Sequence, residues 1–68
     1  MQTKTDIDMI VSEDCIGKRV FMVAEPTIKG HVTQVITLLA GRSYTVDWFH
    51  EGGLHSANFY GFQLRLED

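Results

Sequence analysis

A twenty-residue run around two adjacent glycines constrains the fold of this chain more than any other feature. The run is GRSYTVDWFHEGGLHSANFY, residues 41–60. Apolar and polar side chains alternate over residues 44–49 and again over 54–60, which is the period of a half-buried strand. Glu51-Gly52-Gly53 separates the two segments and suits a tight turn. The run therefore predicts a β-hairpin. Because five aromatic residues lie in it, we expect it to hold the main core and any binding face.

Three further strands are expected on similar grounds. They are residues 18–24, 30–39 and 64–66. Pro26 ends the first strand, because proline has no amide proton for a ladder. The alternation of the second strand slips near Val35, which indicates a bulge, and residues 61–63 interrupt the pattern before the last strand. The pattern predicts an all-β domain, a small five-stranded antiparallel barrel that is closed or nearly closed.

The small size of the chain suggests that a partner subunit contributes to its stability. A single domain of 68 residues is marginal alone, because it buries only ~60% of its unfolded surface. Cys15 is the only cysteine, so no internal disulfide can form. Small domains without disulfides often depend on a metal or on oligomerisation. We therefore expect a homo-oligomer.

The chain divides at residue 15. We assign residues 1–15 to an N-terminal arm and residues 16–68 to the barrel. The arm begins polar and turns apolar over residues 7–11, and Ser12-Glu13-Asp14 suits a turn or one helical turn rather than a stable helix. We expect a flexible arm whose apolar end packs on the barrel. The alternative is an arm that reaches a neighbouring subunit.

Composition narrows the classes of function. The first residues lack the basic and apolar regions of a secretory leader, and no apolar run approaches the ~20 residues of a membrane span. With the free thiol, this predicts a cytoplasmic protein that does not contact membranes. The net charge is −3, with five basic and three acidic residues over 16–66 and acidic ends on both sides. Scattered cations do not make the basic footprint of a nucleic-acid-binding protein, so nucleic acid stays an open but unfavoured partner.

The spacing of glycines and aromatics over residues 16–67 carries a resemblance. It rests on Gly17-x-x-Val20, Gly30-His31-Val32, the run Tyr44-Thr45-Val46-Asp47-Trp48 and the run Phe59-Tyr60-Gly61-Phe62-Gln63-Leu64. This pattern resembles the SH3-like barrel superfamily, with its Tudor-type members. The resemblance implies an SH3-like barrel that acts as a binding module, of the kind found in small bacterial, phage or mobile-element accessory proteins.

A smaller set of positions is similar to a family of enzymes. These positions are Gly17-x-Arg19-Val20, Gly30, Tyr44-Thr45-Val46 and Ser56-Ala57-Asn58-Phe59-Tyr60. They resemble the plasmid-borne type II dihydrofolate reductases, small barrels that work as homotetramers around a pore. In that family the run at 56–60 lines the pore and binds folate and NADPH, so the resemblance implies NADPH binding by Ser56, Asn58, Phe59 and Tyr60. The chain departs from the family at Met22, where the family has a lysine that attracts its substrates, and at Asn58, where it has glutamine.

The aromatic residues offer a second site. Tudor-type barrels hold methylated cations in aromatic cages through cation–π attraction. The candidates here are Tyr44, Trp48, Phe49, Phe59, Tyr60 and Phe62. The alternative places Trp48, Phe59 and Phe62 in the core, because a barrel this small needs its large side chains inside. We favour the core for Trp48 and Phe59. Phe49 and Tyr60 are the rings expected at the surface.

Reactive groups give no clear catalytic pattern. His50 and His55 flank the tight turn with Glu51 between them, but hairpin tips of this kind are usually solvated, so we expect no metal site. Ser56 follows His55 directly and points to the opposite face of a strand, so the two are no nucleophile–base pair. We therefore expect no catalytic residues.

These patterns favour a non-enzymatic, self-associating module that binds a protein partner through the face of its third and fourth strands. If Ala57 and Phe59 point inwards, then Ser56, Asn58 and Tyr60 point outwards together. The full set of binding candidates is Phe49, Ser56, Asn58, Tyr60, Lys18 and Arg42. No cofactor is expected, except NADPH in the reductase-like alternative.

Overall fold

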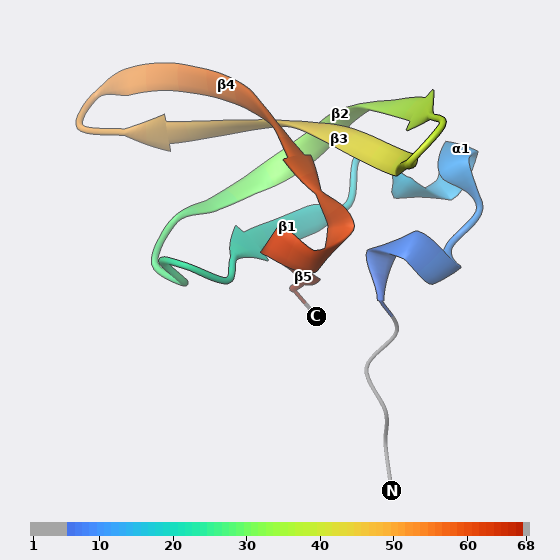
Figure 1. Cartoon of the computed structure of the whole chain (residues 1–68). Coiled ribbons are helices and arrows are strands. Elements are labelled where there is room, and N and C mark those ends of the chain that lie inside the picture. The colour runs from blue at the N-terminus through green and yellow to red at the C-terminus, as the bar shows by residue number, and fades with distance from the viewer. Residues whose placement is uncertain (1–5, 68) are drawn as a thin grey trace, which may run out of the picture.

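The computed structural model describes residues 6–67 and has an all-β architecture (Figure 1). Five antiparallel strands form one sheet in the order β4-β3-β2-β1-β5. The strands are β1 (Arg19–Met22), β2 (Lys29–Leu38), β3 (Gly41–His50), β4 (Gly53–Tyr60) and β5 (Leu64–Leu66). Three single turns of helix accompany them: η1 (Ile7–Met9), α1 (Ser12–Cys15) and η2 (Gly61–Gln63). The prediction of a five-stranded antiparallel β domain is confirmed.

Two tight hairpins set the register of the sheet. Glu51 and Gly52 both have positive φ, 52° and 79°, as a two-residue type I′ turn requires. This turn pairs His50 with Gly53 and Phe49 with Leu54, and the pairing continues unbroken to Ser43 and Tyr60. In β2 the register shifts between Val32 and Gln34, so the predicted bulge exists and lies slightly before the expected position. The bulge bends the long strand and helps the sheet to curl.

The core lies on the concave side of the curled sheet. Its buried side chains are Ile7, Cys15, Val20, Met22, Val32, Tyr44, Val46 and Leu64. Gly30 is also buried, and a Cβ at this position would collide with the carbonyl oxygen of Asp47 and with Val46. Trp48 and Phe59 are half-buried against this core, as expected, whereas Phe62 is 72% exposed and is not the core residue that the sequence suggested. Its place in η2, outside the alternating strands, accounts for the difference.

The described part of the expected arm belongs to the core. Ile7 and Cys15 are fully buried, and α1 lies beside the turn that joins β2 to β3 (Figure 1). Polar contacts hold this segment as well: the Tyr44 hydroxyl donates to Asp8 Oδ1 at 2.5 Å, and Arg42 Nη1 donates to the Ile10 carbonyl at 2.7 Å. The segment 6–15 is therefore anchored through Ile7 and Cys15, whereas Met9 and Val11 remain exposed. The element α1 is the single helical turn expected there. Residues 1–5 of the arm lie outside the described residues.

Two ion pairs of Glu67 hold the end of the last strand against the neighbouring strands. Glu67 Oε2 lies 2.7 Å from Lys29 Nζ, and Glu67 Oε1 lies 3.6 Å from Arg19 Nε. The hydrogen bond from Lys29 lowers the pKa of the Glu67 carboxyl. These contacts join the start of β2 and the start of β1 to the end of β5. Within residues 6–67, no helix is long and apolar enough to cross a membrane.

Candidate functional site

The outer face of the β3–β4 hairpin carries most of the predicted binding residues. Phe49 lies opposite Leu54, Asp47 opposite Ser56, and Thr45 opposite Asn58. Their side chains point away from the core, because the intervening residues, which include Val46 and Ala57, face inwards. Phe49, Ser56, Asn58 and Tyr60 thus share one face, as the alternation predicted.

Two side-chain hydrogen bonds between β3 and β4 hold the polar residues in the middle of this face in place. Ser56 Oγ donates to Asp47 Oδ1 at 2.6 Å, and Thr45 Oγ1 donates to Asn58 Oδ1 at 2.7 Å. The carbonyl end of the Asn58 amide faces Thr45, so its NH₂ group points towards solvent and can donate to a ligand. The centre of the face therefore presents one carboxylate and one amide in fixed positions.

The end of the face nearest the tight turn is apolar. Phe49 is 78% exposed and Leu54 is 61% exposed, and they are direct cross-strand neighbours. They frame a shallow groove of about 440 Å³, whose remaining lining residues are Lys29, Gly30, His31, Thr33, Asp47 and Trp48. The groove combines an apolar wall with basic groups on β2 and an acidic group on β3. Paired apolar side chains that remain exposed beside charged groups are typical of interaction sites.

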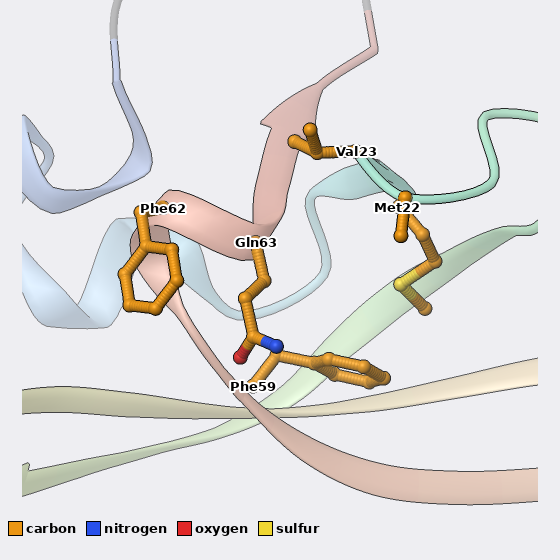
Figure 2. Close-up of a pocket in the computed structure, with 6 residues that line it drawn as sticks. Met22, Val23, Phe59, Phe62 and Gln63 are labelled. Carbon is orange, nitrogen blue, oxygen red and sulfur yellow. The ribbon is translucent and has the colours of Figure 1, made fainter.

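The other end of the face meets η2. The rings of Tyr60 and Phe62 stack with centroids 5.9 Å apart and planes 8° apart. Gln63 Oε1 accepts a hydrogen bond of 2.9 Å from the backbone N–H of Tyr60, which caps the end of β4. A second, apolar cleft of about 240 Å³ opens here, between the end of β1 and the end of β4. Figure 2 shows Gln63 reaching towards β4, with Phe62 on one side and Met22 and Val23 on the other.

Three of the predicted site residues lie elsewhere. Lys18 precedes β1, which β2 and β3 separate from β4 in the sheet. Arg42 is half-buried, and its guanidinium bonds to Ile10 and lies 3.3 Å from the Tyr44 hydroxyl, so it holds the N-terminal segment rather than the outer face. Phe59, part of the reductase-like set, points to the inner face and packs against Trp48 with ring centroids 5.9 Å apart. The structure therefore groups Phe49, Ser56, Asn58 and Tyr60 without Lys18, Arg42 and Phe59.

Sequence reasoning missed Leu54 as a surface residue of this face. A signal was present, because a two-residue turn at Glu51 and Gly52 places Leu54 directly opposite Phe49. The same register places Asp47 opposite Ser56 and so identifies the polar pair. By contrast, the contribution of β2 to the groove depends on the bulge near Thr33, which the sequence located only approximately.

The inner side of the hairpin carries an aromatic row. His55 stacks on Trp48 with centroids 5.5 Å apart, and the rings of His50 and His55 are 6.1 Å apart. In the described chain, residues 6–67, no three histidine, cysteine or acidic side chains form a group suited to a metal. The aromatic residues considered for a cage do not share one surface, because Tyr44 is buried, Phe49 is on the outer face and Trp48 is on the inner face.

A partly buried polar cluster of Asp8, Cys15, Arg42 and Tyr44 lies away from these surfaces. Burial, aided by the hydrogen bond to Asp8, raises the pKa of Tyr44 to about 12. Burial also raises the pKa of the Cys15 thiol, which lies 3.6 Å from the Ile7 carbonyl and 3.7 Å from Arg42 Nη1. Every member of this cluster contacts the segment 7–15, so the cluster ties that segment to the sheet.

Comparisons with known proteins identify no relative. No family model, curated protein or solved structure matches the chain significantly.

Proposed function

We propose that this chain is a non-enzymatic, self-associating SH3-like binding module that binds an extended segment of a partner protein on the outer face of β3 and β4. Five antiparallel strands with a single turn before a short last strand support the SH3-like assignment that the sequence resemblance implies. The observation that carries the binding proposal is the exposed Phe49–Leu54 pair beside the groove. An aliphatic or aromatic side chain of the partner would cover this pair.

The polar groups around the groove form its rim. Lys29 and His31 lie on one side and Asp47 on the other. Lys29 is already paired with Glu67 and Asp47 with Ser56, so the apolar pair, rather than a charge, selects the partner. The amide of Asn58 would donate to a backbone carbonyl of the partner segment. Exposed apolar anchors with a polar rim are the usual anatomy of such surfaces.

Peptide selection with a counter-selection tests the proposal. Short random peptides are selected on the wild-type chain and counter-selected on Phe49→Ser, with Leu39→Ser as the matched control. Leu39 is fully exposed in the turn between β2 and β3, away from the groove. We expect selected peptides to carry an apolar anchor, to bind wild type and Leu39→Ser equally, and to shift the amide resonances of residues 47–56. Failure to enrich any peptide against Phe49→Ser, or shifts confined to other strands, would contradict the proposal.

A reductase-like homotetramer is the second candidate. It is supported by the common outward direction of Ser56, Asn58 and Tyr60, the side chains that the family resemblance assigns to the pore. Met22, at the position of the family's lysine, is buried, so this chain would bind NADPH without that cation. NADPH-dependent turnover of dihydrofolate by wild type, and its loss in Asn58→Ala, would establish this activity. Absence of any NADPH-induced shift at residues 56–60 would remove it.

A further inference from the structure

The free edge of β4 has none of the usual devices that keep strands apart. β4 is the terminal strand of the sheet, and its eight residues pair with β3 without a bulge. Its sequence, GLHSANFY, contains no lysine, arginine, acidic residue or proline. Natural edge strands are normally blunted by such residues, by bulges or by extreme shortness. The opposite edge, β5, follows this rule, because it has three residues with Arg65 at its centre.

The hairpin geometry shows which backbone groups of β4 are free. In a two-residue hairpin the residues that flank the turn are a hydrogen-bonded pair, and such pairs alternate along the ladder. His50 and Gly53 flank this turn, so the odd-numbered residues of β4 bond to β3. The N–H and C=O groups of the even-numbered residues therefore point to the free edge. The bond from the Tyr60 N–H to Gln63 Oε1 agrees with this direction, since β3 cannot be its partner.

Three residues of β4 remain for pairing, and they are symmetric about the middle one. Leu54, Ser56 and Asn58 each present one donor and one acceptor at the edge, while Gln63 occupies the donor of Tyr60. An antiparallel partner related by a two-fold axis at Ser56 would place Leu54 beside Asn58 of the second copy, and Ser56 beside its own counterpart. Every one of these donors would then meet an acceptor. Small side chains at the axis, Ser56 and Ala57, leave room for the approach.

We infer that two copies of this chain associate by antiparallel pairing of β4 with β4 about a two-fold axis at Ser56. This inference specifies the self-association in the proposed function, and it concerns the backbone edge rather than the outer face. A second copy fits better than an unrelated peptide because the free groups are self-complementary about one residue and no like charges meet across the axis. The pairing joins the outer faces of both copies into one continuous surface with a Phe49–Leu54 patch on each side.

Ser56→Lys and hydrogen exchange test the pairing. Lysine at the axis places two bulky cations side by side in the dimer. It removes the side-chain bond from Ser56 to Asp47 but no backbone bond to β3, because the Ser56 backbone does not bond to that strand. Sedimentation equilibrium of the wild-type chain should give twice the monomer mass at high concentration, and Ser56→Lys should stay monomeric. Phe49→Ser is the matched variant on the outer face: it should remain dimeric while it loses peptide binding, which separates failure of the pairing from failure of the binding proposal.

The wild-type chain alone also decides the question if the lysine variant does not fold. The amides of Leu54, Ser56 and Asn58 should exchange rapidly at low concentration and become protected as the dimer forms. A wild-type chain that is monomeric at all concentrations would overturn the pairing. A dimer in which these three amides still exchange rapidly, or a dimer that a folded Ser56→Lys variant leaves unchanged, would overturn it as well.

Discussion

The Tyr44 hydroxyl donates a 2.5 Å hydrogen bond to Oδ1 of Asp8, thirty-six positions away in the chain. The contact connects the centre of β3 to the segment before α1. Arg42 reinforces it from the same strand, through its bond to the Ile10 carbonyl. The N-terminal segment is therefore part of the folded domain, and the barrel alone would lack Ile7 and Cys15 from its core.

Removal of the hydroxyl should weaken this connection. Tyr44→Phe removes a hydrogen bond to the Asp8 carboxylate, which is exposed and can bond to water instead, so it should lower the free energy of unfolding by about 1–2 kcal/mol. Urea denaturation measures the change. Tyr60→Phe is the control, because that hydroxyl belongs to a ring that is 45% exposed. Equal stability of Tyr44→Phe and wild type would contradict a structural role for the bond.

The same residue predicts a loss of stability at alkaline pH. The pKa of Tyr44 rises from an ordinary 10.0 to about 12 in the folded protein. The unfolded chain therefore releases this proton first, so the contribution of Tyr44 is complete below pH 10 and declines between pH 10 and about 12. Denaturation curves over this range should fall more steeply for wild type than for Tyr44→Phe. Parallel curves would show that the hydroxyl is not held in its neutral form.

Cys15 can report on the N-terminal segment. Its thiol is buried, and burial raises its pKa, so thiolate is scarce and reagents cannot reach it. We expect slow labelling by a disulfide reagent in the native protein, faster labelling in Tyr44→Phe, and the rate of a free thiol in urea. Rapid labelling of the native wild-type protein would mean that the segment 7–15 is detached in solution.

Two glycines of the sheet should differ in how strongly alanine affects stability. Gly30→Ala puts a methyl group against the Asp47 carbonyl and Val46, so we expect a destabilisation of about 1–3 kcal/mol. At Gly53 the nearest atoms to an added Cβ are 3.8 and 3.9 Å away, which is ordinary contact. Gly53→Ala should therefore change stability by less than about 1 kcal/mol. Thermal denaturation of both variants compares them, and a neutral Gly30→Ala would argue against the close approach of β2 and β3.

The local features of this fold could be predicted from the sequence, whereas contacts between residues distant in the chain could not. Alternation over residues 44–60 and the turn at Glu51 and Gly52 were enough to predict the hairpin and the direction of Ser56, Asn58 and Tyr60, because both signals are local. The Asp8–Tyr44 bond joins residues 36 positions apart in the chain, and no periodicity in the sequence indicates it. Arg42 looked like a surface cation for the same reason. Phe62 was considered for the core because its side chain is hydrophobic, and hydrophobicity alone does not show that the turn η2 directs this ring towards solvent.

The outer face exists as a binding surface only if Ser56 points outwards and Ala57 points inwards. Thiols introduced singly by Ser56→Cys and Ala57→Cys, with buried Cys15 as the slow internal reference, measure these directions through labelling rates. At concentrations low enough to keep the chain monomeric, we predict that the thiol at position 56 reacts at the rate of a free thiol and the thiol at position 57 markedly more slowly. Faster labelling at position 57, or equal rates in two folded variants, would contradict the outer face and both functions proposed for it.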